Sequence, residues 1–243
     1  MFSYLNPISS SSENLSSEIE RNEIKDFSEC KTDDENDIRK MIQSTRSYTE
    51  NHLNQVEHSR NEMNNSCEFV PSSNMIRFSK LFSGIPLYFD EKIQLTQLMI
   101  EQSRYFALLL SSLVKKVFSI PIESVHLFRD IQSGKYWKMN IPSFSFVCFS
   151  ARIAFNSNGS LFYNLRYFEQ VYWNDLKPFL NGRCSSSIEI VRRLINFYYM
   201  VTCHELSHNI DANHDLNFIN RLERVSARFM DQRDSFISTF VFQ

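Results

Sequence analysis

The fold of this chain is decided by residues 188–214, which read IEIVRRLINFYYMVTCHELSHNIDANH. Just before them, Ser186 and Glu189 have capping-box spacing, in which each side chain satisfies a free donor at the start of a helix. A helix is therefore predicted over about residues 187–210. One stripe of this helix follows three- and four-residue spacing and is expected to face the interior; it comprises Leu194, Phe197, Val201, His204 and His208.

The string His204-Glu-Leu-Ser-His208 places two histidines four positions apart on the predicted helix. Side chains at this spacing project from one face about a turn apart, so both ring nitrogens can reach one ion. Catalytic zinc takes three protein ligands and leaves a fourth position for water. Glu205 lies about 100° round the helix from His204, where it can act as general base on that water. The string therefore predicts Zn²⁺ as cofactor, His204 and His208 as ligands and Glu205 as catalytic residue.

The third zinc ligand is expected to be His214. It follows His204 by ten residues, which is the spacing of the third ligand in the pattern HExxHxxGxxH. The chain must turn back after the helix to bring His214 to the ion, and Asp211 stands where the pattern has glycine. Asp211 and Asn213 tolerate left-handed backbone geometry, so the turn remains feasible. Glu223 and Asp215 stay open as alternative third ligands.

Three other interpretations of the motif stay open: packed core histidines, a surface coincidence and a purely structural metal site. With six histidines in 243 residues, an HExxH string arises by chance in roughly one such chain in a hundred. The added spacing of His214 makes a metal site the preferred interpretation.

The segment before the motif helix carries both helix and strand patterns. The Asn158-Gly159 pair favours positive φ and predicts a tight hairpin turn. Apolar periodicity predicts a long helix over about residues 90–118. Further strands are predicted over residues 75–78, 85–89, 125–128, 143–148, 153–155 and 161–165, and a last helix over about 215–231. The expected fold is α+β, with a small antiparallel sheet packed against the long helix and the HExxH helix.

The first 66 residues differ in composition from the rest of the chain. They contain a serine cluster, mixed charge and few apolar residues, too few to offset the entropy of ordering. We expect residues 1–66 to form a disordered or linker tail, with a short polar helix over 34–43 as an alternative. Residues 67–243 are expected to form the α+β domain.

Bulk composition excludes several classes of partner. The net charge is −2, which gives no attraction to nucleic acid or to an anionic membrane. The five cysteines include no CxxC pair, and the N-terminus lacks the basic and apolar regions of a secretory signal. No apolar run approaches the ~20 residues of a membrane span. We therefore expect an intracellular, cytoplasmic protein.

Two strings together resemble a known family. Residues 158–168, NGSLFYNLRYF, and residues 201–209, VTCHELSHN, are similar to the C-terminal region of large sacsin-like proteins, which are common in fungi and carry an ATPase domain of the heat-shock-ninety type. The resemblance covers about residues 67–229 and implies a zincin-like module within the broader HExxH metallopeptidase superfamily. The family pattern has HELAHN, a histidine at the position of His214 and another four residues on, where this chain has Phe218. No nucleotide-binding motif occurs here, so ATP-driven activity is not carried over.

These observations support two hypotheses. The first is a zinc-dependent hydrolase whose substrate is a peptide or protein lying along the edge of the hairpin as an added strand. The second is a non-catalytic zincin-like interaction module that associates with chaperone-like assemblies.

Overall fold

The computed structural model describes residues 35–48, 75–130, 153–182 and 188–242. The chain divides into two compact units, Met1–Lys40 and Met41–Gln243. Residues 35–43 are helical, within the segment named above as a short polar helix. The remainder of the predicted tail, the predicted strand at 143–148 and Ser186 of the capping box lie outside the described residues.

Five strands of the described chain form one mixed sheet with the order β1-β2-β3-β5-β4. Their bounds are β1 Met75–Phe82, β2 Ile85–Asp90, β3 Val125–Arg129, β4 Ala154–Ser157 and β5 Ser160–Asn164. The α+β class is confirmed, but the prediction of an antiparallel sheet is wrong for the two central pairings. β2 with β3 and β3 with β5 are parallel, because a helix crosses over between β2 and β3 and returns the chain to the same end of the sheet.

The two antiparallel pairings are hairpins with matching turns. Ser83 and Gly84 have φ of 50° and 85°, and Asn158 and Gly159 have φ of 51° and 88°. Positive φ at both central residues is the signature of a type I′ turn, whose twist suits a two-residue hairpin. The turn predicted at Asn158-Gly159 is confirmed, and it places β4 at the edge of the sheet beside β5.

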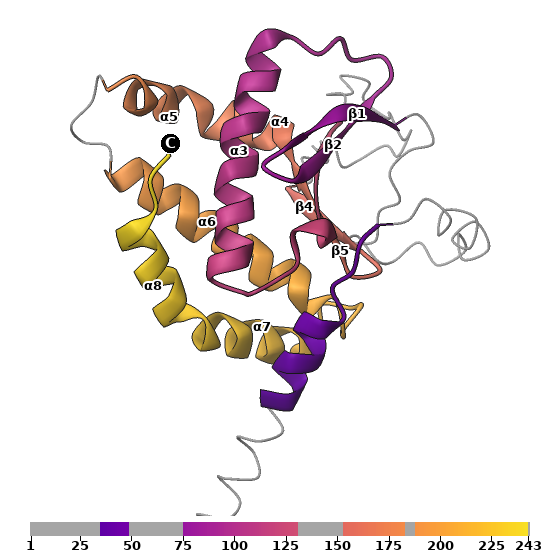
Figure 1. The fold of residues 1–243 in the computed structure, drawn as a ribbon. Coiled ribbons are helices and arrows are strands. Elements are labelled where there is room, and N and C mark those ends of the chain that lie inside the picture. The colour runs from indigo at the N-terminus through magenta and orange to yellow at the C-terminus, as the bar shows by residue number, and fades with distance from the viewer. Residues whose placement is uncertain (1–34, 49–74, 131–152, 183–187, 243) are drawn as a thin grey trace, which may run out of the picture. The chain divides into compact units, whose positions relative to one another are not determined.

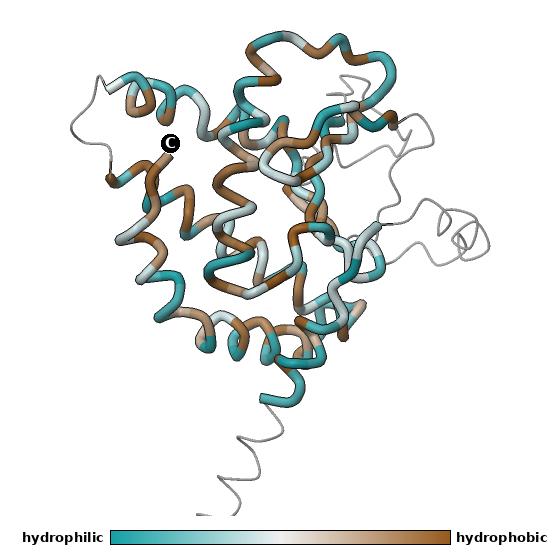
Figure 2. The backbone as a smooth tube through the Cα atoms, in the orientation of Figure 1, coloured by the Kyte–Doolittle hydropathy of each residue, from teal (hydrophilic) through white to brown (hydrophobic). Residues whose placement is uncertain are grey.

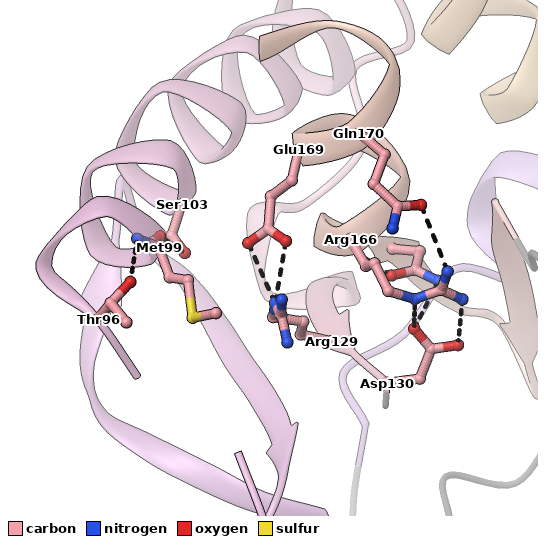
Figure 3. Close-up of polar contacts among 9 residues, drawn as sticks. Thr96, Met99, Ser103, Arg129, Asp130, Arg166, Glu169 and Gln170 are labelled. Carbon is pink, nitrogen blue, oxygen red and sulfur yellow. Dashed lines mark hydrogen bonds and ion pairs between the residues drawn. The ribbon is translucent and has the colours of Figure 1, made fainter. Parts of the chain in front are cut away.

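Two 20-residue helices, α3 (Gln97–Lys116) and α6 (Ile188–Ser207), cover the sheet. Figure 1 shows them side by side, with α3 against β1, β2 and β3, and α6 against β4 and β5. The helix predicted over 90–118 begins later than expected because the Thr96 hydroxyl accepts a hydrogen bond from the Met99 amide, at 3.2 Å, which caps the helix there (Figure 3).

The other described helices surround α6. They are α4 Leu165–Val171, α5 Trp173–Leu180, α7 Leu216–Arg228 and α8 Met230–Thr239. The helix predicted over 215–231 is thus two helices that meet at Phe229, whose backbone is not helical. Hydrophobic and hydrophilic residues alternate along α7 (Figure 2), as expected of a helix with one face on the protein.

Helices α4 and α5 were not anticipated from the sequence, and α4 is fixed by ion pairs that close only in the folded chain. Arg166 of α4 donates to both carboxylate oxygens of Asp130, at 2.7 and 2.9 Å, and Arg129 donates to Glu169 at 3.0 Å (Figure 3). Both acceptor–donor pairs join the end of β3 to α4. Short bidentate contacts of this kind fix orientation as well as adding energy.

The main core lies between the sheet and the helices. Phe106 of α3 stacks on Phe168 of α4 with ring centroids 4.6 Å apart, and it lies 4.8 Å from the ring of Tyr198 of α6. The opposite face of the sheet carries a second cluster made of Tyr88, Phe128, Phe155 and Phe162. Aromatic contacts at these spacings add to the free energy of apolar burial.

Residues 41–48 belong to the second compact unit, although their composition predicts that they are part of the tail. Met41 is fully buried, and Tyr48 packs edge-on against Phe162 at 5.2 Å. A few apolar side chains are therefore enough to order residues 41–48, because these side chains pack against the sheet. The domain boundary expected at residue 66 stays a prediction, and residues 41–48 are the described part of the expected tail that lies in the second unit. Among the described helices, none combines the length and apolar character that crossing a bilayer requires.

Candidate metal centre

The motif helix forms as predicted, but its phase differs from the expected one. Thr202 and Glu205 are buried, whereas Val201, His204 and His208 are only partly so. Leu194 in the stripe predicted to face the interior is fully buried, but the later residues of the stripe lie at the margin of the interior. The reason is that α6 packs on the sheet along one side and on α7 along another, and the histidines lie where α6 and the start of α7 meet.

The structure brings His204, His208 and His214 together. The Nε2 atom of His204 lies 3.2 Å from Nε2 of His208 and 3.2 Å from Nε2 of His214. One ligand nitrogen from each of the three lies within 4.8 Å of the others. Tetrahedral zinc with nitrogen ligands at about 2.1 Å requires nitrogens roughly 3.4 Å apart. The two short separations match this spacing, so the cluster fits a zinc ion.

His208 is held in the tautomer that a metal ligand needs. Its Nδ1 lies 2.9 Å from the backbone oxygen of Asp211, and a carbonyl can only accept, so Nδ1 carries the proton. In the neutral ring, Nε2 then carries a lone pair, and this atom is the one that lies 3.2 Å from Nε2 of His204. This arrangement, in which the second ring nitrogen donates to a carbonyl, is the usual support of metal-ligating histidines.

The turn that returns His214 to the cluster is made without left-handed residues. Positive φ occurs at Ser83, Ser119 and Asn158 among the described non-glycine residues, and not at Asp211 or Asn213. The left-handed geometry that Asp211 and Asn213 were expected to tolerate is therefore not used in this turn. Asp211 instead fixes the turn through its carboxylate, which accepts a hydrogen bond from Nε of Arg221 at 2.5 Å, and through the carbonyl that holds His208.

Phe218 forms an apolar floor beneath the three imidazoles, a role that sequence reasoning missed. Its ring centroid lies 4.9 Å from His204, 4.6 Å from His208 and 4.7 Å from His214, and the side chain is 2% exposed. The only available signal was its position four residues after His214. A buried apolar shell of this kind limits water access to a metal centre and lowers its local dielectric.

Burial and the neighbouring imidazoles lower the pKa of His204 to about 4. Burial acts most strongly because it disfavours the charged ring, and the positive charges that His208 and His214 can carry add to it. A histidine must be neutral to bind a metal. His204 therefore offers a lone pair throughout the physiological pH range.

Glu205 of α6 is 4% exposed, and α6 contacts both strands of the β4–β5 hairpin. Its backbone oxygen accepts a hydrogen bond from Nδ2 of Asn156 in β4, at 2.6 Å. Burial raises the pKa of Tyr163 in β5, and the Glu205 carboxylate adds to this rise. The Glu205 carboxylate is thus close enough to Tyr163 of β5, the strand next to the edge strand β4, to act on its pKa.

The two alternative third ligands lie outside the histidine cluster. The Asp215 carboxylate accepts a hydrogen bond from the Phe218 amide at 3.1 Å and so caps α7. Glu223 is exposed on α7. In the described chain, the ligand set that the geometry supports is therefore His204, His208 and His214.

No family model matches the sequence, and no curated protein or solved structure is significantly similar to it. The resemblance to sacsin-like proteins stays a prediction. The case for a metal centre therefore rests on the chain's own residues.

Proposed function

We propose that this chain binds a zinc ion through His204, His208 and His214 and uses it to hydrolyse peptide bonds. The observation that carries the proposal is the convergence of three imidazoles, with Nε2 of His204 3.2 Å from Nε2 of each partner. Since His208 Nε2 carries a lone pair and no proton, it can donate that pair to a cation.

Each residue has a definite role in the proposed reaction. A zinc ion held by His204, His208 and His214 would supply Lewis acidity. Glu205, next to His204 in the helix, would act as the general base that takes a proton from the attacking water. Its burial strengthens the effect because charges interact more strongly away from solvent.

The position of β4 supports a peptide as substrate. Among the described strands, β4 pairs only with β5, and Asn156 in β4 contacts the backbone of Glu205. An extended peptide could therefore add to the free edge of β4, where backbone hydrogen bonds would hold it beside the metal. We also propose an intracellular location, for which the buried free thiol of Cys203 is typical.

The test combines metal analysis with one conservative substitution. The purified chain should contain one zinc per molecule, and Glu205→Gln should retain it while hydrolysis of a fluorogenic peptide library falls by about 10²–10⁴-fold. Glu189→Gln, on an exposed position of the same helix, is the matched control and should leave both unchanged. A metal-free wild type would overturn the metal centre, and full hydrolysis by Glu205→Gln would remove Glu205 as the base.

A second candidate function is a non-catalytic module that binds another protein, including a component of a chaperone-like assembly. It is favoured by a cavity of about 750 Å³ outside the metal centre, lined by residues of α5, α6, α8 and the C-terminal segment. Ile188 and Val241 at this cavity are 71% and 63% exposed. In this case the zinc would be structural, and no substrate in the library would be cleaved.

A further inference from the structure

Residues 41–48, here called the strap, cross the β4–β5 turn more than 100 positions away in sequence. The Arg46 amide donates to the Gly159 carbonyl at 3.0 Å, and the Ser160 hydroxyl donates to the Arg46 carbonyl at 2.8 Å. The Arg46 side chain also donates to the carbonyl of Asn158. Three separate hydrogen bonds therefore fasten the strap to one hairpin turn.

The closeness of this crossing depends on Gly159. A Cβ atom added at Gly159 would lie 2.2 Å from the backbone oxygen of Ser44, far inside van der Waals contact. Backbone cannot yield as a flexible side chain can, so any side chain here would displace the strap. Gly159 therefore serves two needs, the positive φ of the turn and the approach of another segment of backbone.

The strap also reaches the end of the motif helix through two asparagines. Nδ2 of Asn209 donates to the Met41 carbonyl at 2.8 Å, and Oδ1 of Asn209 accepts from Nδ2 of Asn156 at 2.6 Å. Asn156 also donates to the Glu205 carbonyl at 2.6 Å and accepts from the Gly159 amide at 2.9 Å. Helix ends leave four carbonyls without intrahelical partners, and Asn156 satisfies one of them.

This network meets the metal centre at the turn after the helix. Asn209 directly follows His208, and the turn it opens carries the Asp211 carbonyl that holds His208 Nδ1. The two bonds of Asn156 to the Glu205 carbonyl and the Gly159 amide are buried, and breaking either one would leave a desolvated polar group. The strap, the β4–β5 turn and residues 209–214, here called the ligand turn, are therefore held as one unit.

We propose that the strap is a positioning element of the metal centre, which holds residues 209–214 so that His208 and His214 meet His204. Because one arm of the test reads zinc affinity, that arm rests on the proposed function. The other arm uses metal-free protein and stands independently of it.

The experiment compares two glycine variants of the full chain. Gly159→Ala and Gly84→Ala both force alanine into a type I′ turn, at φ of 88° and 85°. Only Gly159→Ala meets the strap, since Gly84 has nothing closer than the Ile122 side chain at 3.5 Å. The two variants share the backbone strain, so their difference isolates the strap. Ser160→Ala, which removes only the hydroxyl bond to Arg46, is a milder variant in case Gly159→Ala does not fold.

Two readouts follow the ligand turn. Zinc affinity, measured by competition with a chromogenic chelator, should weaken about tenfold in Gly159→Ala relative to Gly84→Ala, and the visible spectrum of the cobalt-substituted protein should change with it. In metal-free protein, the amides of Asn209, Ile210 and Asp211, which bond to Leu206 and Ser207, should exchange faster in Gly159→Ala than in Gly84→Ala. Ser160→Ala should shift both readouts in the same direction, to a smaller extent.

Equal zinc affinity and equal amide exchange in the two glycine variants would overturn the proposal. So would faster exchange of residues 41–48 with a ligand turn that stays protected, because the strap would then be attached without positioning anything. A wild type that binds no zinc overturns the proposed function alone, and the exchange comparison then decides the role of the strap.

Discussion

Replacing His214 with alanine tests the metal centre most directly. His214 is exposed, so its removal leaves no cavity, and the metal-free variant should unfold at the same temperature as the wild type. Structural zinc sites with four ligands have apparent binding free energies of about 10–16 kcal/mol, or about 3 kcal/mol for each ligand. The dissociation constant of His214→Ala should therefore rise by about 100-fold or more.

This change in affinity converts into a measurable difference in thermal stability. Zinc at 100 times the wild-type dissociation constant stabilises the folded chain by about 2.7 kcal/mol. At the same zinc concentration, a 100-fold weaker variant gains about 0.4 kcal/mol. For a domain of about 200 residues, 1 kcal/mol shifts Tm by about 2–4 °C. Zinc should then raise the wild-type Tm by about 5–11 °C and that of His214→Ala by about 1–2 °C.

The assay is calorimetry or fluorescence-monitored melting, with and without zinc, on protein freed of metal by a chelator. Glu223→Ala is the control, because Glu223 is an exposed carboxylate of α7 outside the histidine cluster, and it should respond to zinc as the wild type does. An undiminished zinc response in His214→Ala would refute His214 as a ligand. A lost response in Glu223→Ala would restore the alternative that the geometry disfavours.

Three further predictions concern the folded domain. Burial lowers the pKa of His126 to about 3, and the charge of Arg77 lowers it further. Between pH 6.5 and 3 the unfolded chain therefore binds a proton that the native chain does not, and the free energy of unfolding should fall by about 1.4 kcal/mol per pH unit on acidification. Denaturant titrations of His126→Phe should show a weaker dependence on pH, and a pH dependence equal to that of the wild type would contradict this prediction. The Thr202 hydroxyl forms hydrogen bonds with Tyr163 Oη and with the Tyr198 carbonyl. Thr202→Val should therefore lower the free energy of unfolding by about 1–3 kcal/mol, and Tyr163→Phe should lower it by less. Equal losses in denaturant titrations of the two variants would contradict this order. Arg221→Leu, which removes the Arg221–Asp211 ion pair, should weaken zinc binding about tenfold. Unchanged zinc affinity in the chelator assay would show that residues 209–214 do not need this ion pair to hold the histidines.

Much of the site could be anticipated because it is local in sequence. The four-residue spacing of His204 and His208 puts both rings on one face of any helix, and the ten-residue spacing of His214 requires only that the chain turn back. The Asn158-Gly159 pair likewise predicts its own turn, because positive φ is a property of those residues rather than of their surroundings. Capping at Thr96 is equally local, because its hydroxyl accepts from the Met99 amide, and it was missed because apolar periodicity extended past the true start of α3.

Contacts between distant segments set the limit of that reasoning. The parallel pairing of β3 depends on where α3 delivers the chain, and α4 is fixed by Arg166 and Asp130, 36 residues apart. The phase error on α6 has the same origin, because periodicity identifies an apolar stripe but not which neighbours cover it. Asp211 was judged by its backbone tolerance, whereas its actual contribution comes from Arg221 and from the carbonyl that holds His208.

The sequence by itself therefore determined the helix, the hairpin turn and the three histidines, since each follows from preferences that act within about ten residues. Only the tertiary structure decided the mixed sheet, the course of the ligand turn and the strap that joins Met41 to Asn209. Those features depend on hydrogen bonds and burial between segments up to 168 positions apart. Such contacts form when the chain closes on itself, and no local pattern of residues encodes them.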